Sequence, residues 1–429
     1  MVDTREPAFL LSIWNDSEAE IIRELLASHD IECSVSSQVP HSVMPLTVNG
    51  LGEIRVHVPA PLLEEARRIV EAYRKTAPAT AAGAPAQTGV VLPMSHTVHA
   101  PTRIDLAGGT LDIWPIYLLL DRPVTVNVAI DLHAVAEVSS LKDGRIELFS
   151  EDLDRRQQAA DAEHLATDGP LPLPARLVRS FHPDGGVRLR TRATAPAGSG
   201  LGGSSALAAA AAVALTHLTG QDTETDVHAL ARRLANLEAQ VLGIPTGVQD
   251  YYPALLGGVL KLTFAAEGIT AQRLPVGSQA LAERLVLVYE GATRSSGLSN
   301  LDMLRRFLED DGDTRAAMAA VAQAAAHLAE ALATGDLDAA GLAMNREMAA
   351  RRRLSPTVLT PATERLFAAA EGAGALGAKV CGAGGGGCSV YWAPADGRQR
   401  LADALTNAGG QVLPFQVEPR GLLAAAPPA

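Results

Sequence analysis

The stretch that most constrains the fold is PAGSGLGGSSALAAAAAVAL, residues 196–215, in which a glycine-rich run leads directly into an almost pure alanine segment. Glycines at 198, 200, 202 and 203 free the backbone to turn several N–H groups inward. The alanine run predicts a helix, whose first turn adds unpaired N–H donors and the positive end of its dipole. A loop and helix start of this kind favour the binding of phosphate.

Two serines follow these glycines and offer a second kind of ligand. The side-chain oxygens of Ser204 and Ser205 can cap the helix or reach a magnesium ion that bridges phosphates. No lysine follows the last glycine, so the loop is not a P-loop. Gly198, Gly200 and Gly203 satisfy G-x-G-x-x-G, but in a poor context for a dinucleotide site. For an isolated segment of this kind, a glycine turn with serine caps is commoner than a phosphate site, so motifs elsewhere in the chain must distinguish the two interpretations.

The length and charge of the chain limit the classes of protein it can belong to. Its 429 residues are too many for one ordinary core and indicate two or three domains. A formal net charge of −12 argues against nucleic-acid or membrane partners, because both need a basic face. Cys33, Cys381 and Cys388 are too few for a disulfide framework or a zinc site. No leader pattern opens the chain, and we expect a soluble, cytoplasmic protein.

Residues 1–75 predict a small domain of their own. Its apolar patterns follow the order β-α-β-β-α, which is typical of a small ferredoxin-like fold. Residues 76–92, rich in Ala, Pro, Thr and Gly, predict a flexible linker. The expected elements are strands at 8–14, 31–37 and 53–59 and helices at 15–31 and 60–75.

From residue 93 the chain alternates strand and helix patterns to its end without a second linker, which predicts a mixed α/β body. We expect two lobes, residues 93–280 and 281–429. The clearest elements are strands at 124–140 and 284–291 and helices at 204–218, 224–242, 313–334 and 362–373.

Three glycine-containing motifs in this body resemble those of the GHMP kinases. PAGSGLGGSSA resembles the second motif of that superfamily, APTRIDLAGGTLD (100–112) the first, and GAKVCGAGGGGCSVYW (377–392) the third, in the family's order. The resemblance implies an α+β, two-lobe fold. It consists of an α/β lobe with a left-handed crossover and a ferredoxin-like lobe, with ATP between them.

The resemblance also implies which residues bind ATP and Mg²⁺ and which carry out phosphoryl transfer. Glu238 and Ser205 take the place of the metal ligands, and Asp250, in the sugar-kinase pattern G-x-x-D, that of the residue accepting the substrate proton. Arg103 takes the place of an arginine near the transferred phosphate, where its permanent charge suits the transition state. Without the glycine loops, a solvated carboxylate would be the better interpretation of Glu238 and a helix cap that of Asp250. The residues implied for ATP are Pro196, Gly198, Gly200, Leu201, Gly202, Gly203, Ser204, Ser205, Ala206, Gly384 and Gly385.

The first motif bears on the substrate. Galactokinases carry a Glu-His pair where this chain has Gly109 and Thr110, so galactose itself is disfavoured. AGGTLD is instead similar to the AGGGTD of the heptose-phosphate and fucose kinase branch, although Val248 replaces a lysine of that branch. We therefore expect a sugar or sugar-phosphate kinase, with a heptose 7-phosphate phosphorylated at the anomeric hydroxyl as the leading substrate. The expected substrate-binding residues are Gly108, Gly109, Asp112, Gly247 and Arg294.

Two alternatives stay open at this stage. A mevalonate-type kinase is the weaker, because that branch usually carries a lysine where Arg103 stands. The other is a non-catalytic sugar sensor, against which the retained Ser205, Glu238 and Asp250 argue. Aspartate in a turn is an equal alternative for Asp112.

Two further segments carry predictions. Arg294 is preferred as the anchor for a substrate phosphate, because guanidinium groups bind phosphate bidentately. The cluster Arg351–Arg353 is expected instead to be the solvated end of a helix. Residues 1–75 resemble a small prokaryotic signal-transducing domain, which implies a regulatory partner or self-association as a homodimer.

Overall fold

The structure is a computed structural model in which the chain divides into two compact units, Met1–Val90 and Val91–Ala429. The residues whose structure is described are 7–13, 22–23, 25–27, 29, 31, 33–37, 54–76, 95–181, 185–219, 226–291, 297–355 and 357–422.

The first unit is a three-stranded antiparallel sheet with a helix. The strands β1 (Pro7–Ile13), β3 (Ile54–Pro59) and β2 (Ser34–Ser37) pair in that order. A short 3₁₀ turn, η1 (Ala60–Leu62), leads into α2 (Leu63–Thr76), whose apolar side buries Ala66 and Val70 in the unit's core. These elements confirm the strands and the second helix predicted from the sequence. Of the first predicted helix, the described residues 22–23 and 25–27 are helical, and the predicted linker beyond Thr76 lies outside the described residues.

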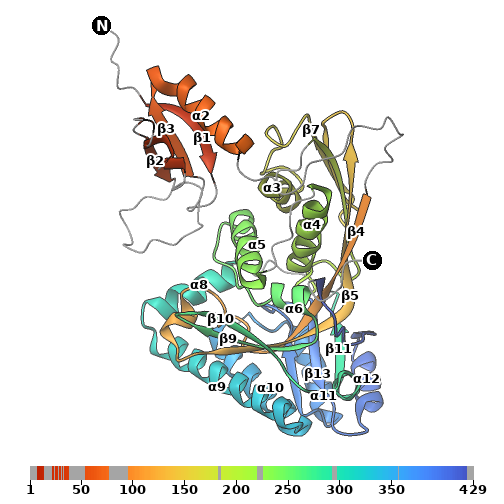
Figure 1. The fold of residues 1–429 in the computed structure, drawn as a ribbon. Coiled ribbons are helices and arrows are strands. Elements are labelled where there is room, and N and C mark those ends of the chain that lie inside the picture. Colours follow the sequence, from red (N-terminus) through yellow and green to blue (C-terminus); the bar gives the residue numbers. More distant parts are fainter. Residues whose placement is uncertain are drawn as a thin grey trace. The chain divides into compact units, whose positions relative to one another are not determined.

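The second unit begins with a seven-stranded sheet of order β10-β9-β5-β8-β6-β7, with β4 paired to β5 (Figure 1). All the pairs are antiparallel except β6 with β8. The long strand β5 is the centre of this sheet, because β4, β8 and β9 all pair with it. The strands are β4 (Ser95–Ala107), β5 (Val124–Leu141), β6 (Ile146–Ser150), β7 (Arg155–Ala159), β8 (Gly186–Ala193), β9 (Val259–Ala265) and β10 (Gly268–Arg273).

Helices pack on this sheet and carry the predicted site. The alanine-rich helix α4 (Gly203–Thr219) is buried along most of its length and packs on β4 and β5. Its small side chains allow a close approach of helix and sheet. Around it lie α3 (Pro172–Phe181), α5 (Val227–Leu242) and α6 (Tyr251–Leu256), and the 3₁₀ turn η2 (Ile116–Leu119) follows the first motif.

The C-terminal part is a four-stranded antiparallel sheet of order β12-β13-β11-β14, with helices around it. The strands are β11 (Leu285–Tyr289), β12 (Gly377–Val380), β13 (Cys388–Trp392) and β14 (Gln411–Leu413). The helices are α7 (Ser278–Ala282), α8 (Gly297–Leu308), α9 (Gly312–Thr334), α10 (Leu337–Leu354), α11 (Pro361–Gly372) and α12 (Arg398–Asn407).

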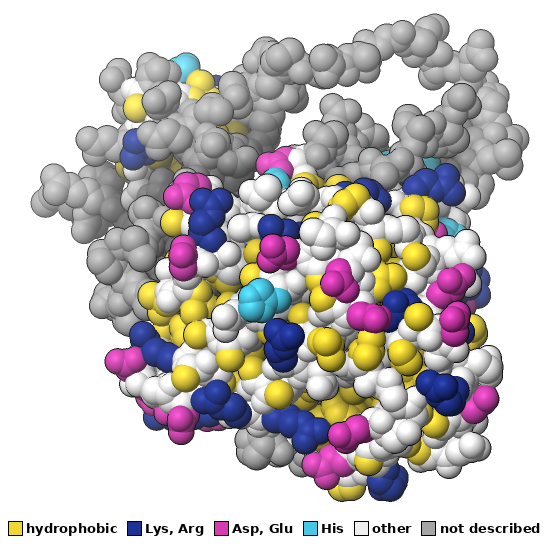
Figure 2. All heavy atoms as spheres, turned by 90° about the horizontal axis from the view of Figure 1, so that it is seen from below, with side chains coloured by type: hydrophobic (Ala, Val, Ile, Leu, Met, Phe, Trp, Pro, Cys, Tyr) yellow, Lys and Arg dark blue, Asp and Glu magenta, His cyan; other side chains and the backbone are white. Residues whose placement is uncertain are grey.

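One of these helices, α9, is long and apolar enough to cross a membrane, with 23 residues and a mean hydropathy of 1.3. Half of the apolar 18-residue stretch of α9 that passes this test is buried inside the unit, where α9 packs against α10. On the face of the molecule shown in Figure 2, acidic and basic side chains are interspersed instead of gathering into a patch of one sign.

Candidate active site

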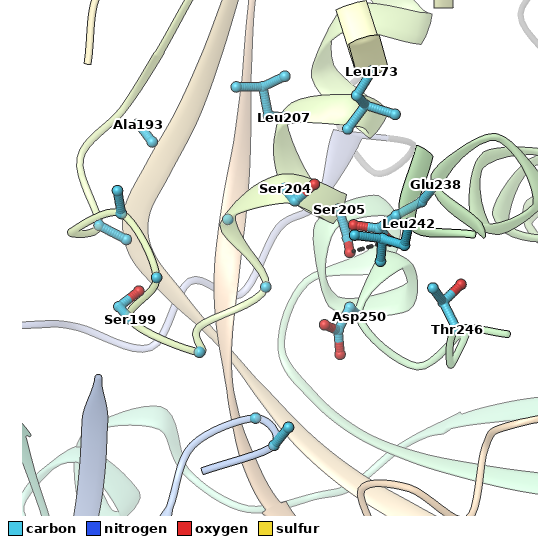
Figure 3. Close-up of a pocket in the computed structure, with 18 of the residues that line it drawn as sticks. Leu173, Ala193, Ser199, Ser204, Ser205, Leu207, Glu238, Leu242, Thr246 and Asp250 are labelled. Atoms are coloured by element: carbon cyan, nitrogen blue, oxygen red, sulfur yellow. Dashed lines mark hydrogen bonds between the residues drawn. The ribbon is translucent and has the colours of Figure 1, made fainter. Parts of the chain in front are cut away.

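A cavity of about 880 Å³ lies where the glycine loop, α4, α5 and the start of α6 meet (Figure 3). Leu173, Leu207 and Leu242 contribute to an apolar part of its wall, and charged and hydroxyl side chains line another part. Most of the predicted site residues line this cavity. They are Arg103, Gly109, Asp112, Pro196, Gly198, Gly200, Gly202, Gly203, Ser204, Ser205, Glu238, Gly247 and Asp250.

The glycine loop has the backbone that its sequence requires. Gly198, Gly200 and Gly202 have φ values of 69°, 76° and 70°, which residues with side chains rarely adopt. At Gly200 a Cβ atom would lie 2.5 Å from the carbonyl oxygen of Cys381. The loop is therefore pressed against the third motif by backbone contact, and Cys388 N–H donates to the Ser199 carbonyl over 2.8 Å.

The third motif presents different residues to the cavity from those predicted. Gly382 and Ala383 line the cavity, whereas Gly384 and Gly385 do not. Gly385 N–H donates to the Val358 carbonyl over 2.9 Å, and a Cβ atom on Gly384 would meet the same oxygen at 2.5 Å. Those two glycines allow close approach to the segment after α10.

Three other predicted site residues also lie outside the cavity wall. Leu201 and Ala206 are buried behind the loop, with exposed fractions of 0% and 1%. Gly108 packs under the first motif, where a Cβ atom would lie 2.2 Å from the Val124 carbonyl oxygen. Arg294 lies outside the described residues.

Arg103 and Asp250 form a bidentate ion pair beside the glycine loop. The guanidinium Nε and Nη2 donate to the two carboxylate oxygens of Asp250 over 2.9 and 2.6 Å, and Nη1 donates to the Gly200 carbonyl over 2.5 Å. Burial alone would lower the pKa of Arg103, but the carboxylates of Asp250 and Asp105 outweigh it and raise that pKa. A fixed positive charge therefore lies next to the loop, held by the last residue before α6.

Glu238 reaches the start of α4 from α5. Its Oε2 accepts a hydrogen bond from Ser205 Oγ over 3.3 Å (Figure 3). The same oxygen accepts one from Tyr251 Oη over 2.6 Å. Burial raises the pKa of Glu238, while the hydroxyls of Tyr251 and Ser204 act in the opposite direction. Sequence reasoning did not identify Tyr251, because a tyrosine after the G-x-x-D aspartate has no pattern of its own.

The side-chain oxygens of Glu238 and Ser205 are of the kind that ligate a magnesium ion. Mg²⁺ prefers hard oxygen ligands and usually takes one or two carboxylates together with water and substrate phosphates. The described residues contain no group of three or more His, Cys, Asp or Glu side chains able to hold a metal alone. Glu238 and Ser205 are therefore suited to holding Mg²⁺ only in company with phosphate oxygens.

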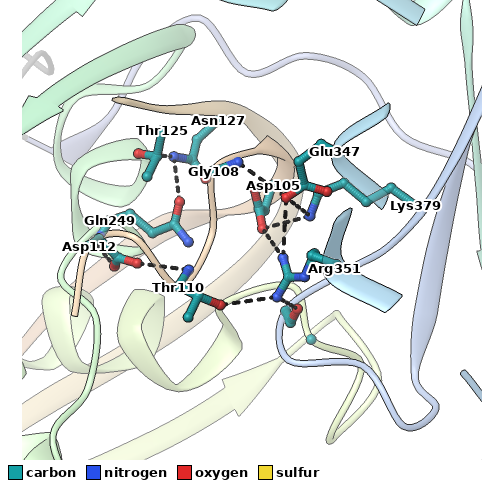
Figure 4. Close-up of polar contacts among 12 residues, drawn as sticks. Asp105, Gly108, Thr110, Asp112, Thr125, Asn127, Gln249, Glu347, Arg351 and Lys379 are labelled. Atoms are coloured by element: carbon teal, nitrogen blue, oxygen red, sulfur yellow. Dashed lines mark hydrogen bonds and ion pairs between the residues drawn. The ribbon is translucent and has the colours of Figure 1, made fainter. Parts of the chain in front are cut away.

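The first motif surrounds a second buried carboxylate that lines the cavity, that of Asp112. Asp112 accepts backbone N–H groups from Gln249 over 3.0 Å and from Thr110 over 3.2 Å (Figure 4). Burial raises its pKa to about 6, despite the Gln249 hydrogen bond, and the charge of Asp250 adds to the rise. Glycine is required at 247, because a Cβ atom there would lie 2.0 Å from Asp112 Oδ2.

Four buried charged side chains form a network behind the first and third motifs (Figure 4). Lys379 Nζ lies 3.0 Å from Asp105 Oδ2 and 3.4 Å from Glu347 Oε1. Arg351 Nη1 lies 3.4 Å and 3.6 Å from the same two oxygens. Burial favours protonation of Asp105, but Lys379 and Arg351 outweigh it and lower its pKa. The network joins β4 to α10 and β12.

The interpretation of Arg351 as a solvated helix end is therefore wrong, although it holds for Arg352 and Arg353, which are exposed. Arg351 is 5% exposed and lines the cavity. Its Nη2 donates to Thr110 Oγ1 over 3.3 Å and to the Gly382 carbonyl over 3.0 Å. The spacing of Glu347 and Arg351, four residues apart, places both on one face of α10 and could have indicated their pairing.

Sequence profiles of known families match three segments of the chain. Residues 173–258 match the GHMP kinases N terminal domain and residues 328–411 the GHMP kinases C terminal domain. Residues 9–74 match DUF2007, a family of the prokaryotic signal-transducing type. The second unit therefore carries segments that match the N- and C-terminal domains of the GHMP kinases, in that order.

Individual relatives agree with this assignment. The chain is 27% identical over 333 residues to D-glycero-alpha-D-manno-heptose 7-phosphate kinase of Campylobacter jejuni, covering 76% of this chain and 97% of that protein. It is 45% identical to mevalonate kinase of Thermococcus gammatolerans over 65 residues, which are 15% of this chain and 19% of that protein. The crystal structure of a D-glycero-D-manno-heptose 1-phosphate kinase from Bacteroides thetaiotaomicron has a TM-score of 0.60 at 22% identity, covering 76% and 97% of the two chains. The predicted GHMP kinase fold is confirmed.

Proposed function

We propose that this protein is an ATP- and Mg²⁺-dependent kinase that transfers the γ-phosphoryl group to a hydroxyl of a sugar or sugar phosphate. The observation that carries the proposal is that two side-chain pairs from distant parts of the sequence meet at one cavity. The pairs Arg103–Asp250 and Ser205–Glu238 come from four separate segments and line one cavity together with the glycine loop.

In this proposal the loop amides and the first turn of α4 hold the phosphates of ATP. The apolar wall around Leu207 and Leu242 receives the adenine ring of ATP. Phosphoryl transfer asks a protein mainly for positioning and for compensation of charge. Bound Mg²⁺ would neutralise phosphate charge, with Glu238 and Ser205 as its protein ligands. Arg103 supplies a permanent positive charge beside the same loop.

Asp250 accepts the proton of the attacking hydroxyl. Its carboxylate lines the cavity beside Gly202, where a Cβ atom would lie 3.3 Å from Asp250 Oδ2. The ion pair with Arg103 holds the carboxylate in one orientation. Asp112 lies further along the cavity, where it would accept hydrogen bonds from sugar hydroxyls.

A heptose 7-phosphate, phosphorylated at its anomeric hydroxyl, is our leading substrate. The Campylobacter relative, whose name includes that substrate, matches along 97% of its length, whereas the mevalonate kinase match covers only 65 residues. A measurement of ATP consumption against heptose 7-phosphates, fucose, galactose, other hexoses and mevalonate distinguishes these acceptors. Turnover of mevalonate alone would favour the mevalonate-type alternative.

Replacement of the proposed base tests the chemistry. Asp250→Asn keeps the size of the side chain but removes its ability to take a proton, so kcat should fall by about 10²- to 10⁴-fold. Nucleotide affinity should stay within about threefold, because the phosphate-binding amides are untouched. Coupled-assay kinetics and calorimetric titration of a non-hydrolysable ATP analogue measure the two quantities.

Asp403→Asn, a change on the exposed side of α12, serves as the control and should retain wild-type turnover. Comparable turnover in the Asp250 variant would remove the proposed base. A wild-type chain that binds nucleotide but transfers no phosphate to any acceptor would favour the non-catalytic sensor.

We further propose that the protein acts in the cytoplasm and that three segments of the chain have different roles. Residues 93–280 would form the ATP-binding lobe and residues 281–429 the second lobe. Residues 1–75 would act in regulation or self-association, since their family match is of a signal-transducing type.

A further inference from the structure

Two consecutive tyrosines at the start of α6 bind different points of α5. Both Tyr251 and Tyr252 are fully buried. Tyr251 Oη donates to Glu238 Oε2 over 2.6 Å, whereas Tyr252 Oη lies 2.9 Å from His228 Nδ1. His228 and Glu238 are ten residues apart on α5, which is about 15 Å along the helix axis. One tyrosine therefore holds the beginning of α5 and the other holds its functional end.

The contact at Glu238 constrains a side chain that would otherwise have several rotamers. Glu238 lies one turn before the end of α5, which stops at Leu242 with Gly243 in the left-handed region at φ 68°. Its Oε2 accepts from both Tyr251 and Ser205, and two donors on one oxygen fix the carboxylate plane.

Tyr251 itself does not line the cavity, whereas its neighbour Asp250 and its partner Glu238 do. The first residues of α6 thus serve the site in two ways. Asp250 pairs with Arg103 beside the glycine loop, and Tyr251 donates to the carboxylate of Glu238, which also accepts from Ser205. A displacement of α6 would move both groups together.

We propose that Tyr251 is a positioning residue, whose hydroxyl holds the Glu238 carboxylate against Ser205 in the orientation that receives a phosphate-bound divalent cation. This inference rests on the proposed kinase function, because it assigns Glu238 to the metal. Hydrogen-bond partners of metal ligands typically contribute about 10- to 100-fold to metal affinity.

The test compares the full-length wild type with Tyr251→Phe and with the matched control Tyr252→Phe, each of which removes one buried hydroxyl. The dissociation constant of a non-hydrolysable ATP analogue is measured by calorimetry, once with saturating Mn²⁺ and once with EDTA. The ratio of the two constants reports how much the metal strengthens binding. Tyr251→Phe should reduce that ratio about tenfold and leave the metal-free constant within about twofold, while Tyr252→Phe should retain the wild-type ratio.

A double variant separates positioning from general loss of packing. If Tyr251 acts through the carboxylate, Tyr251→Phe should reduce the ratio no further in a Glu238→Gln background. An unchanged ratio in Tyr251→Phe, or an equal fall in both tyrosine variants, overturns the inference while leaving the kinase proposal intact. A wild-type chain that binds the analogue equally well with and without Mn²⁺ overturns the metal role of Glu238 and with it this inference. Wild-type turnover without divalent metal is the separate result that would overturn the proposed function.

Discussion

Asp112 is a buried residue whose protonation affects the folded state at mildly acidic pH. Its pKa rises from 3.8 to about 6, so the folded state binds this proton more tightly than the unfolded chain. The stability that follows is full below the unfolded pKa and is lost as the pH rises through about 6. Asp112 should therefore make the wild type about 1 kcal/mol more stable at pH 5 than at pH 8.

Urea unfolding of the wild type and of Asp112→Asn at both pH values measures this contribution. Asparagine cannot titrate, so the difference in unfolding free energy between the two proteins should change by about 1 kcal/mol across that range. A difference that stays constant with pH would contradict the buried environment of the carboxylate.

Single residues also mark the limits of prediction from sequence. The position of the glycines and serines of 198–205 on the cavity wall could be predicted, because their backbone freedom and capping chemistry are local properties. The buried ion pairs of Lys379 could not be predicted, although it is one of only four lysines in the chain. Its partners Asp105 and Glu347 come from distant segments.

The loop from Gly198 to Gly203 is the element in which a single Cβ atom should have the largest effect. Gly200→Ala would impose a side chain at φ 76° and bring a methyl group to 2.5 Å from the Cys381 carbonyl oxygen. The left-handed backbone alone costs about 1–2 kcal/mol. We expect lower stability and at least about a tenfold loss of nucleotide affinity, because the loop must move away from the third motif.

Gly372→Ala provides the control for this change. Gly372 is the exposed last residue of α11, and a Cβ atom there would meet no atom within 4 Å. That variant should keep wild-type affinity in the same calorimetric titration, and equal behaviour of the two variants would contradict the role of loop contact.

At the level of elements, periodicity was sufficient for helices with a clear apolar face or a distinctive composition. The predicted segments 204–218, 224–242, 313–334 and 362–373 correspond to α4, α5, α9 and α11. For α10 the helix end expected at Arg351–Arg353 is present, but periodicity did not reveal that the helix buries Glu347 and Arg351 on its inner face. Buried charges interrupt the apolar pattern on which such predictions depend.

Across the whole second unit, the buried charge network links the seven-stranded sheet to the C-terminal part, beside the hydrophobic core that both share. Lys379→Met would leave Asp105 and Glu347 with one cation less in a site closed to water. Breaking a buried ion pair on one side typically costs about 3–5 kcal/mol, and we expect a loss of that size in urea unfolding.

Lys142→Met, which changes an exposed lysine, should alter stability by less than about 0.5 kcal/mol. The double variant Lys379→Met with Glu347→Gln should lose less than the sum of the two single changes, since no uncompensated charge remains at that position. Additive losses would contradict direct coupling through the network.

The alanine side chains of α4 have a consequence for the thermodynamics of ligand binding. Alanine has no side-chain rotamers to restrict, and the helix is buried against β4 and β5 over most of its length. The amides at its first turn are therefore already ordered before any anion arrives. Association at that end should carry a small entropic penalty, so that its calorimetric signature is set mainly by the groups that enter from α5 and α6.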